Sequence, residues 1–227
     1  MTEKEPLIAK HGGYRRLKSF QLAQLAYDLT ARFCDLYIER SSRTRDQMVQ
    51  AARSGVQNIA EGSQASGTSR KMELKLTNVA RASLEELRLD YEDFLRQRGL
   101  PMWGPEHPAL RRFKAKRCRS LQEVRAWMQG ELELVRGGAE HERTRTTTRT
   151  DTDGRTASVP VRVRPCLSSG LPPYSSVLAA NAALSLLNLS CYLLDRQLSA
   201  QAASFEKEGG FTERLYRVRS AARRSEV

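Results

Sequence analysis

The chain of 227 residues is poor in the side chains that most often perform chemistry, with only three histidines and four cysteines. No histidine follows an acidic residue by three positions, as the Glu-x-x-His motifs of di-iron bundles require. The cysteines, Cys34, Cys118, Cys166 and Cys191, form no CxxC pair and show no zinc-ligand spacing. We therefore predict reduced thiols, no metal, no cofactor and no catalytic residue. An enzyme with an unrecognised site is the least supported alternative.

Aromatic residues are also scarce, at 7% of the chain, while hydrophobic residues make up 40% and charged residues 28%. The strands of a β-sandwich favour β-branched and aromatic side chains, so this composition suits a helical protein better. The hydrophobic content is still high enough for a core. We therefore expect an all-α fold.

Long hydrophobic runs are nearly absent. The first residues, MTEKEPLIAKHGGYRR, contain no apolar run of the kind found in signal peptides. Residues 177–194 carry no charge, which reaches the lower edge of a membrane-spanning helix. Polar residues interrupt this run, flanking aromatic belts are missing, and a helix buried in a bundle gives the same pattern. We expect a cytoplasmic protein with no membrane contact.

Apolar periodicity predicts four long helices. The first covers residues 17–40, and its apolar face is so wide that we expect its own bundle and a neighbouring subunit to cover it. The second begins at a capping box formed by Thr44 and Gln47 and ends at Gly62 in the left-handed C-cap position. Its small residues, including Gly55, would let a neighbouring helix approach closely.

The third predicted helix covers residues 70–98, with Thr68 or Ser69 as N-cap and Gly99 at its end. The last covers residues 176–208 and ends at a Gly-Gly pair. Between them lie a weaker helix and a Thr/Arg/Pro-rich segment without helical period, which predicts disorder. The expected organisation is an N-terminal tail (1–13), bundle helices one to three with a basic connecting helix (14–136), a low-complexity linker (137–176), the last bundle helix (177–208) and a basic C-terminal suffix (209–227). This order predicts an antiparallel four-helix bundle with a long disordered insertion before the last helix.

A glycine-rich stretch lies between the second and third helices. Gly62 and Gly67 have the separation of a phosphate-binding loop, but Thr68 stands where such a loop needs lysine. The residues before it have helical rather than strand periodicity, so the stretch is better interpreted as a hairpin turn. A weaker possibility stays open, in which the amides that start the third helix hold one phosphate oxygen beside Arg70 and Lys71.

The net charge is +12 and the isoelectric point is near 10, which favours an acidic partner such as nucleic acid. Residues 111–119 hold six basic residues and no acid. No zinc finger, RRM signature or helix-turn-helix is present, so we expect binding to the phosphate backbone of RNA or DNA with little sequence preference. The predicted nucleic-acid-binding residues are Arg111, Arg112, Lys114, Lys116, Arg117, Arg119, Arg70, Lys71, Arg217 and Arg219. The alternative is a solvated basic surface without a ligand.

Two short motifs carry a resemblance to a known family. Residues 58–62, NIAEG, and the pattern of residues 80–87 resemble the bacterial four-helix-bundle family first known from intervening sequences in large-subunit ribosomal RNA genes. The likeness covers about residues 14–98, and GGFTERLYRVR is similar to the suffix region of one branch. That family includes the accessory protein of diversity-generating retroelements, a basic pentameric barrel that associates with nucleic acid and a reverse transcriptase. The resemblance implies a homo-oligomer, with five subunits, and a possible reverse transcriptase partner.

Together these features predict a non-enzymatic, self-associating helical-bundle scaffold that binds nucleic-acid backbone through basic patches. The alternative is a protein–protein adaptor with no nucleic-acid role, whose charge only serves solubility.

Overall fold

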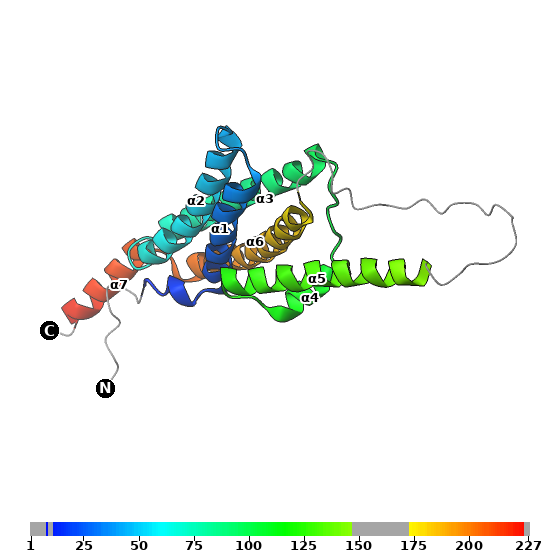
Figure 1. The fold of residues 1–227 in the computed structure, drawn as a ribbon. Helices are drawn as coiled ribbons and strands as arrows, with labels where there is room; N and C mark the ends of the chain where they lie inside the picture. The colour runs from blue at the N-terminus through cyan, green and yellow to red at the C-terminus, as the bar shows by residue number, and fades with distance from the viewer. Residues whose placement is uncertain (1–7, 9–10, 147–172, 225–227) are drawn as a thin grey trace, which may run out of the picture.

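The computed structural model describes residues 8, 11–146 and 173–224, and every regular element in these residues is a helix. The elements, shown in Figure 1, are η1 (Tyr14–Arg16), α1 (Lys18–Tyr37), α2 (Arg43–Ala65), α3 (Arg70–Gln97), α4 (Pro108–Lys116), α5 (Leu121–Thr146), α6 (Tyr174–Glu208) and α7 (Phe211–Arg224). The prediction of an all-α fold is confirmed for this part of the chain.

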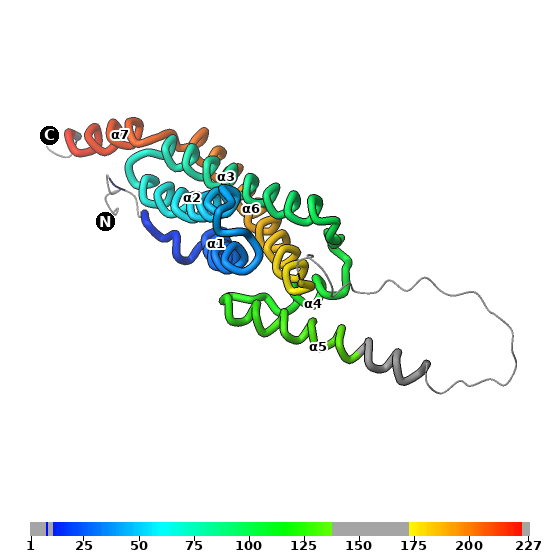
Figure 2. Tube along the Cα trace, turned by 45° about the horizontal axis from the view of Figure 1, so that its top comes forward, coloured from blue at the N-terminus to red at the C-terminus, as the bar shows by residue number. Residues whose placement is uncertain are grey.

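Four long helices pack side by side around the core. Helix α2 packs against α1 and α3, and α6 packs against α1 and α3 on the other side. The short helix α4 and the start of α5 lie against α6, as both views show (Figures 1 and 2). Helix α7 follows α6 and lies at the end of the molecule far from α4.

Helix α1 supplies much of the core because its apolar positions recur every three or four residues. Phe33 is buried and its ring contacts Tyr91 and Phe94 of α3, with centroids 4.9 and 4.8 Å away. The Tyr91 hydroxyl donates a hydrogen bond of 3.0 Å to Thr30 Oγ1, which donates in turn to the Ala26 carbonyl. The one phenol in this core therefore keeps its hydrogen bond while its ring is removed from water.

Small residues bring α2 and α3 close together, as the sequence predicted for Gly55. Gly62 also belongs to this contact, and here the sequence prediction was wrong. Helix α2 does not end at Gly62 but continues to Ala65, and a Cβ on Gly62 would lie 3.3 Å from Leu76 Cβ. The glycine is needed for close approach to α3 rather than for a left-handed turn.

The start of α2 also differs from the prediction. The helix begins two residues earlier, at Arg43, with Ser42 in place of Thr44 as N-cap and no side-chain cap hydrogen bond, so Thr44 and Gln47 form no capping box. The caps of α3 follow the prediction. Ser69 Oγ accepts a hydrogen bond from the Met72 amide, and Gly99 takes a positive φ of 61° after the helix ends.

The single weaker helix expected over residues 106–136 is in fact two helices. The chain turns at Arg117, whose φ of 49° places it in the left-handed region, and α5 starts at Leu121. Helix α5 then continues through Gly137 to Thr146, so the first part of the expected linker is helical. Helix α6 begins at Tyr174, so the last residues of the expected linker are helical too, and residues 147–172 lie outside the described residues.

Helix α6 contains the one candidate membrane span found in the described residues, long and apolar enough by length and composition alone. Within the protein 72% of that window is buried, and α1 and α3 cover it. One serine that interrupts the apolar run is used in this packing, because Ser190 Oγ donates a 3.3 Å hydrogen bond to the Ser19 carbonyl of α1. The span is weak evidence for a membrane, since a buried core helix has the same composition.

Candidate nucleic-acid interface

Helix α4 is amphipathic, and this property separates its cations from the core. Pro108 occupies its first turn, where a missing amide hydrogen costs nothing. Ala109, Leu110 and Phe113 are buried, and the Phe113 ring lies 4.7 Å from the ring of Trp127 in α5. The helix packs against α6, while its basic residues are exposed.

Five cations of this segment are exposed, and we call them together the α4 basic patch: Arg111, Lys114, Lys116, Arg117 and Arg119. None of the five has an ion pair with a carboxylate of the described residues. Lys114 Nζ donates to the Pro105 carbonyl at 3.0 Å. Glu123 hydrogen-bonds the Arg119 amide rather than its guanidinium. Five of the predicted site residues are thus exposed on α4 or directly after it.

Arg112 belongs to the same sequence cluster but has a different environment. Its Nε and Nη2 donate to the two carboxylate oxygens of Glu131 in α5, at 2.7 and 2.6 Å. Glu131 is only 6% exposed, and the hydrogen bonds from Arg112 hold the pKa of its carboxyl below the ordinary value. This two-pronged ion pair joins α4 to α5, so the Arg112 guanidinium is already engaged.

Arg70 is engaged in a similar way at the other end of the molecule. It donates to the carbonyl and hydroxyl of Ser204 at 3.0 and 2.8 Å and to Glu208 at 2.6 Å, which ties the start of α3 to the end of α6. The pKa of Glu208 is lowered by this partner. The neighbouring amides of Thr68 and Ser69 both donate to the Ala65 carbonyl, and the Met72 amide donates to Ser69 Oγ.

The other predicted cations lie at this same far end. Lys71 is exposed beside Arg70, and Arg217 and Arg219 are exposed on α7. Arg217 donates a 3.4 Å hydrogen bond to the carbonyl of Glu208, the residue whose carboxylate Arg70 binds, so α7 starts close to Arg70. Figures 1 and 2 both place α7 at the end of the molecule away from α4. The predicted site residues therefore divide into two separate groups.

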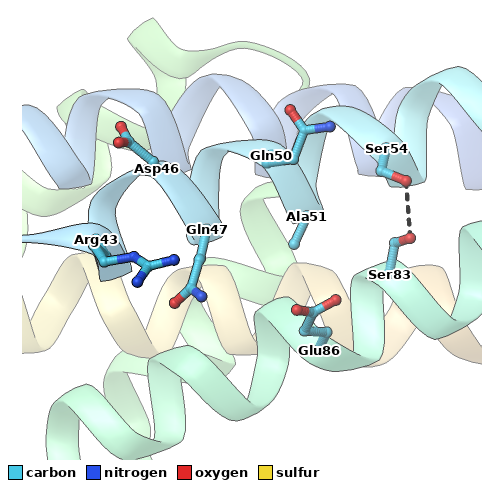
Figure 3. Close-up of a pocket in the computed structure, with 8 residues that line it drawn as sticks. All are labelled: Arg43, Asp46, Gln47, Gln50, Ala51, Ser54, Ser83 and Glu86. Carbon is cyan, nitrogen blue, oxygen red and sulfur yellow. Dashed lines mark hydrogen bonds between the residues drawn. The ribbon is translucent and has the colours of Figure 1, made fainter.

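A polar groove of about 550 Å³ lies between α2 and α3 (Figure 3). Ser54 and Ser83 are hydrogen-bonded across it at 3.0 Å. It is lined by Arg43, Asp46, Gln47, Gln50, Ala51, Ser54, Ser83 and Glu86. These residues carry one cation and two carboxylates, and they include no histidine or cysteine. The excess of negative charge in the groove disfavours a polyanion. The groove also has no histidine or cysteine to act as a catalytic base or nucleophile.

The three cysteines among the described residues are buried thiols. Burial raises the pKa of Cys34 to about 12 and that of Cys191 to about 11. Burial also raises the pKa of Cys118. Because the thiolate is the reactive form, these three sites are poor nucleophiles.

One feature beside the α4 basic patch was missed in the sequence. The rings of Trp103 and His107 are stacked, with centroids 4.1 Å apart and planes within 5° of parallel. The available signal was their spacing of four residues immediately before a basic helix.

The residues of the NIAEG motif lie in α2, where they pack the helix or hydrogen-bond within it. Ile59 and Gly62 are buried in the contact with the core and α3, and Asn58 Nδ2 donates to the Ser54 carbonyl at 2.9 Å.

Comparison of the chain with protein-family models, with curated proteins and with solved structures finds no match in any of the three. Membership of the intervening-sequence family therefore stays a prediction that rests on the short motifs alone.

Proposed function

We propose that the protein is a non-enzymatic scaffold that binds the backbone of nucleic acids through the α4 basic patch. In this proposal α1, α2, α3 and α6 form an antiparallel four-helix bundle. The α4–α5 hairpin is displayed on its side. The observation that carries the proposal is the group of five exposed cations, none of which has a carboxylate partner among the described residues.

Electrostatics favours phosphate as the ligand of this patch. Arg111, Arg117 and Arg119 each present a planar fork that matches two phosphate oxygens, while Lys114 and Lys116 add point charges. Five phosphate contacts on duplex DNA would release enough counterions to make the affinity fall steeply with salt. No base-reading module accompanies the patch, so the proposed binding tolerates sequence changes.

A second basic group extends the proposed contact. Lys71, Arg217 and Arg219 are exposed at the far end of the molecule and would engage a nucleic acid long enough to cover both ends. Arg70 and Arg112 were included in the sequence prediction, but both are held by carboxylates, so we assign them positioning roles in this proposal.

Self-association is the second half of the proposal. Leu189 and Tyr192 of α6 lie one turn apart and are 48% and 54% exposed, and Leu89 of α3 is 52% exposed. Such side chains are candidates for burial between subunits. The number of subunits, five by the family resemblance, and a reverse transcriptase partner stay predictions of that resemblance.

The direct test is binding of the full chain to labelled duplex DNA, single-stranded DNA and RNA at several salt concentrations. We expect affinity to fall by orders of magnitude between about 50 and 200 mM salt, similarly for unrelated sequences. Absence of binding at low salt would contradict the proposal and favour the alternative, an adaptor for another protein. Light scattering tests self-association separately, because a monomer at micromolar concentration would exclude that half alone.

A further inference from the structure

A flat aromatic pair is built into the loop that leads into α4. Trp103 and His107 are stacked in parallel, and both side chains are partly exposed. The Nδ1 atom of His107 is buried and has no hydrogen-bond partner among the described residues. The stack with Trp103 therefore helps to orient this imidazole, and the pair presents an aromatic surface.

The loop that carries this pair is anchored to the core. The Trp103 amide donates a hydrogen bond of 2.8 Å to Asn181 Oδ1 in α6. Asn181 is 1% exposed, and its Nδ2 donates to the Pro101 carbonyl at 3.1 Å. A buried amide side chain thus fixes the backbone on which the stack stands. The platform is held in place before any ligand arrives, which lowers the entropic cost of binding.

The platform continues directly into the α4 basic patch. His107 is the N-cap of α4, and its carbonyl accepts a hydrogen bond of 3.0 Å from the Arg111 amide. This hydrogen bond places the backbone of His107 one helical turn before Arg111. Lys114 reaches back to the Pro105 carbonyl and adds a second charge beside the loop.

We propose that the Trp103–His107 stack is a base-stacking platform and that the α4 basic patch therefore prefers single-stranded nucleic acid to duplex. This inference rests on the proposed function, since the cations must hold the backbone. In a duplex each base is stacked between its neighbours, whereas a single strand can turn a base face onto an aromatic side chain. Cations that follow the backbone next to an aromatic surface are the usual arrangement of single-strand binders.

Tryptophan fluorescence gives a direct readout in the unmodified protein. The chain has two tryptophans, and Trp127 is only 5% exposed against Phe113, so a ligand can reach Trp103 alone. The probe is a thymidine homopolymer of roughly 20 nucleotides, compared with the same strand in a duplex. We expect the single strand to quench the emission of Trp103 and to bind roughly five- to tenfold more tightly than the duplex.

Substitution of His107 separates stacking from charge. His107→Ala should weaken single-strand binding about fivefold and leave duplex binding unchanged, whereas His107→Phe, which keeps a flat ring, should restore the preference. Tyr14→Ala is the matched control because this partly exposed aromatic also has a ring partner, Phe20 at 4.8 Å, but lies in η1 outside the α4 basic patch. Its preference for single strands should equal that of the wild type.

The outcomes distinguish the inference from the proposed function. If both probes bind with salt-sensitive affinity but Trp103 is not quenched and the single strand is not preferred, the platform is excluded and backbone binding stands. If His107→Phe behaves like His107→Ala, the ring acts by other means and stacking is excluded. If neither probe binds at low salt, the proposed function fails and the platform fails with it.

Discussion

Gly55 of α2 lies directly against Leu84 of α3. A Cβ at position 55 would overlap the Leu84 side chain, with Leu84 Cγ only 2.7 Å away. Leu84 is fully buried. The contact between α2 and α3 therefore depends on the missing side chain at this position.

The first prediction follows from this contact. Gly55→Ala should destabilise the protein by about 1–3 kcal/mol through overpacking, although alanine is the better helix former. Gly130→Ala in α5 is the matched control, because nothing lies within 4 Å of the added methyl. There the higher helix propensity of alanine should stabilise the protein by up to about 1 kcal/mol. Chemical denaturation of both variants measures the two effects, and equal shifts in the same direction would contradict the close packing.

The second prediction compares two neighbouring arginines of α4. Arg112→Ala removes the partner of the buried Glu131 carboxylate and should destabilise the fold by on the order of 1–2 kcal/mol. Arg111→Ala, which breaks no ion pair with a described residue, should leave stability nearly unchanged and weaken nucleic-acid binding. Thermal unfolding together with a binding assay separates the two roles, and the reverse assignment would contradict the structure.

The pH dependence of the Arg112 effect has a definite sign. The pKa of Glu131 in the folded protein lies below its ordinary value of 4.5, chiefly because Arg112 donates to it. The stability contributed by the pair is therefore fully present above pH 4.5 and is lost as the pH falls through the lower folded pKa. Wild type and Arg112→Ala should accordingly converge in stability under acid conditions, and a difference that grows with acid would contradict the ion pair.

The third prediction concerns Asp90 in α3, a carboxylate with one oxygen buried and no hydrogen-bond partner among the described residues. Burial, with smaller contributions from Glu86 and Asp93, raises its pKa from 3.8 to about 6. Because the folded state disfavours the charged form, this group costs stability as the pH rises from about 4 to about 6. Asp90→Asn should therefore stabilise the protein at neutral pH by on the order of 1 kcal/mol, after solvent screening.

The gain from Asp90→Asn should shrink as the pH falls from about 6 to about 4 and should disappear well below 3.8, where Asp90 is protonated in both states. Glu39→Gln, at an exposed position, serves as the control and should change stability little at any pH. Denaturation midpoints across this pH range provide the measurement. An asparagine variant that is less stable than wild type at neutral pH would show that Asp90 has a favourable partner.

The sequence was informative where the determinants are local. The four long helices follow from apolar periodicity, and Ser69, Gly99 and Gly209 mark helix ends because caps depend on only a few neighbouring residues. The break at Arg117 was not predicted, since a left-handed non-glycine residue has no strong sequence signal.

The sequence was less informative where a residue depends on a distant partner. Gly62 looked like a helix end because glycine often is one, and its actual neighbour, Leu76, becomes visible only after α3 folds back. The basic run predicted six equivalent cations, whereas Glu131 of another helix removes Arg112 from that set. The sequence thus predicts the positive charge of this segment, but it does not show which of the six cations is engaged by a carboxylate of another helix.

The salt dependence of duplex binding tests the central claim most directly. The triple variant Arg111→Ala, Lys116→Ala, Arg117→Ala should weaken binding to all duplex sequences alike and should reduce the slope of log affinity against log salt by up to about 2.7. The control triple variant Arg32→Ala, Arg40→Ala, Arg53→Ala removes the same charge from exposed positions on α1, on the α1–α2 loop and on α2. It should leave the slope unchanged. Equal loss of slope in both variants would show that only net charge matters and would contradict the α4 basic patch as the binding site.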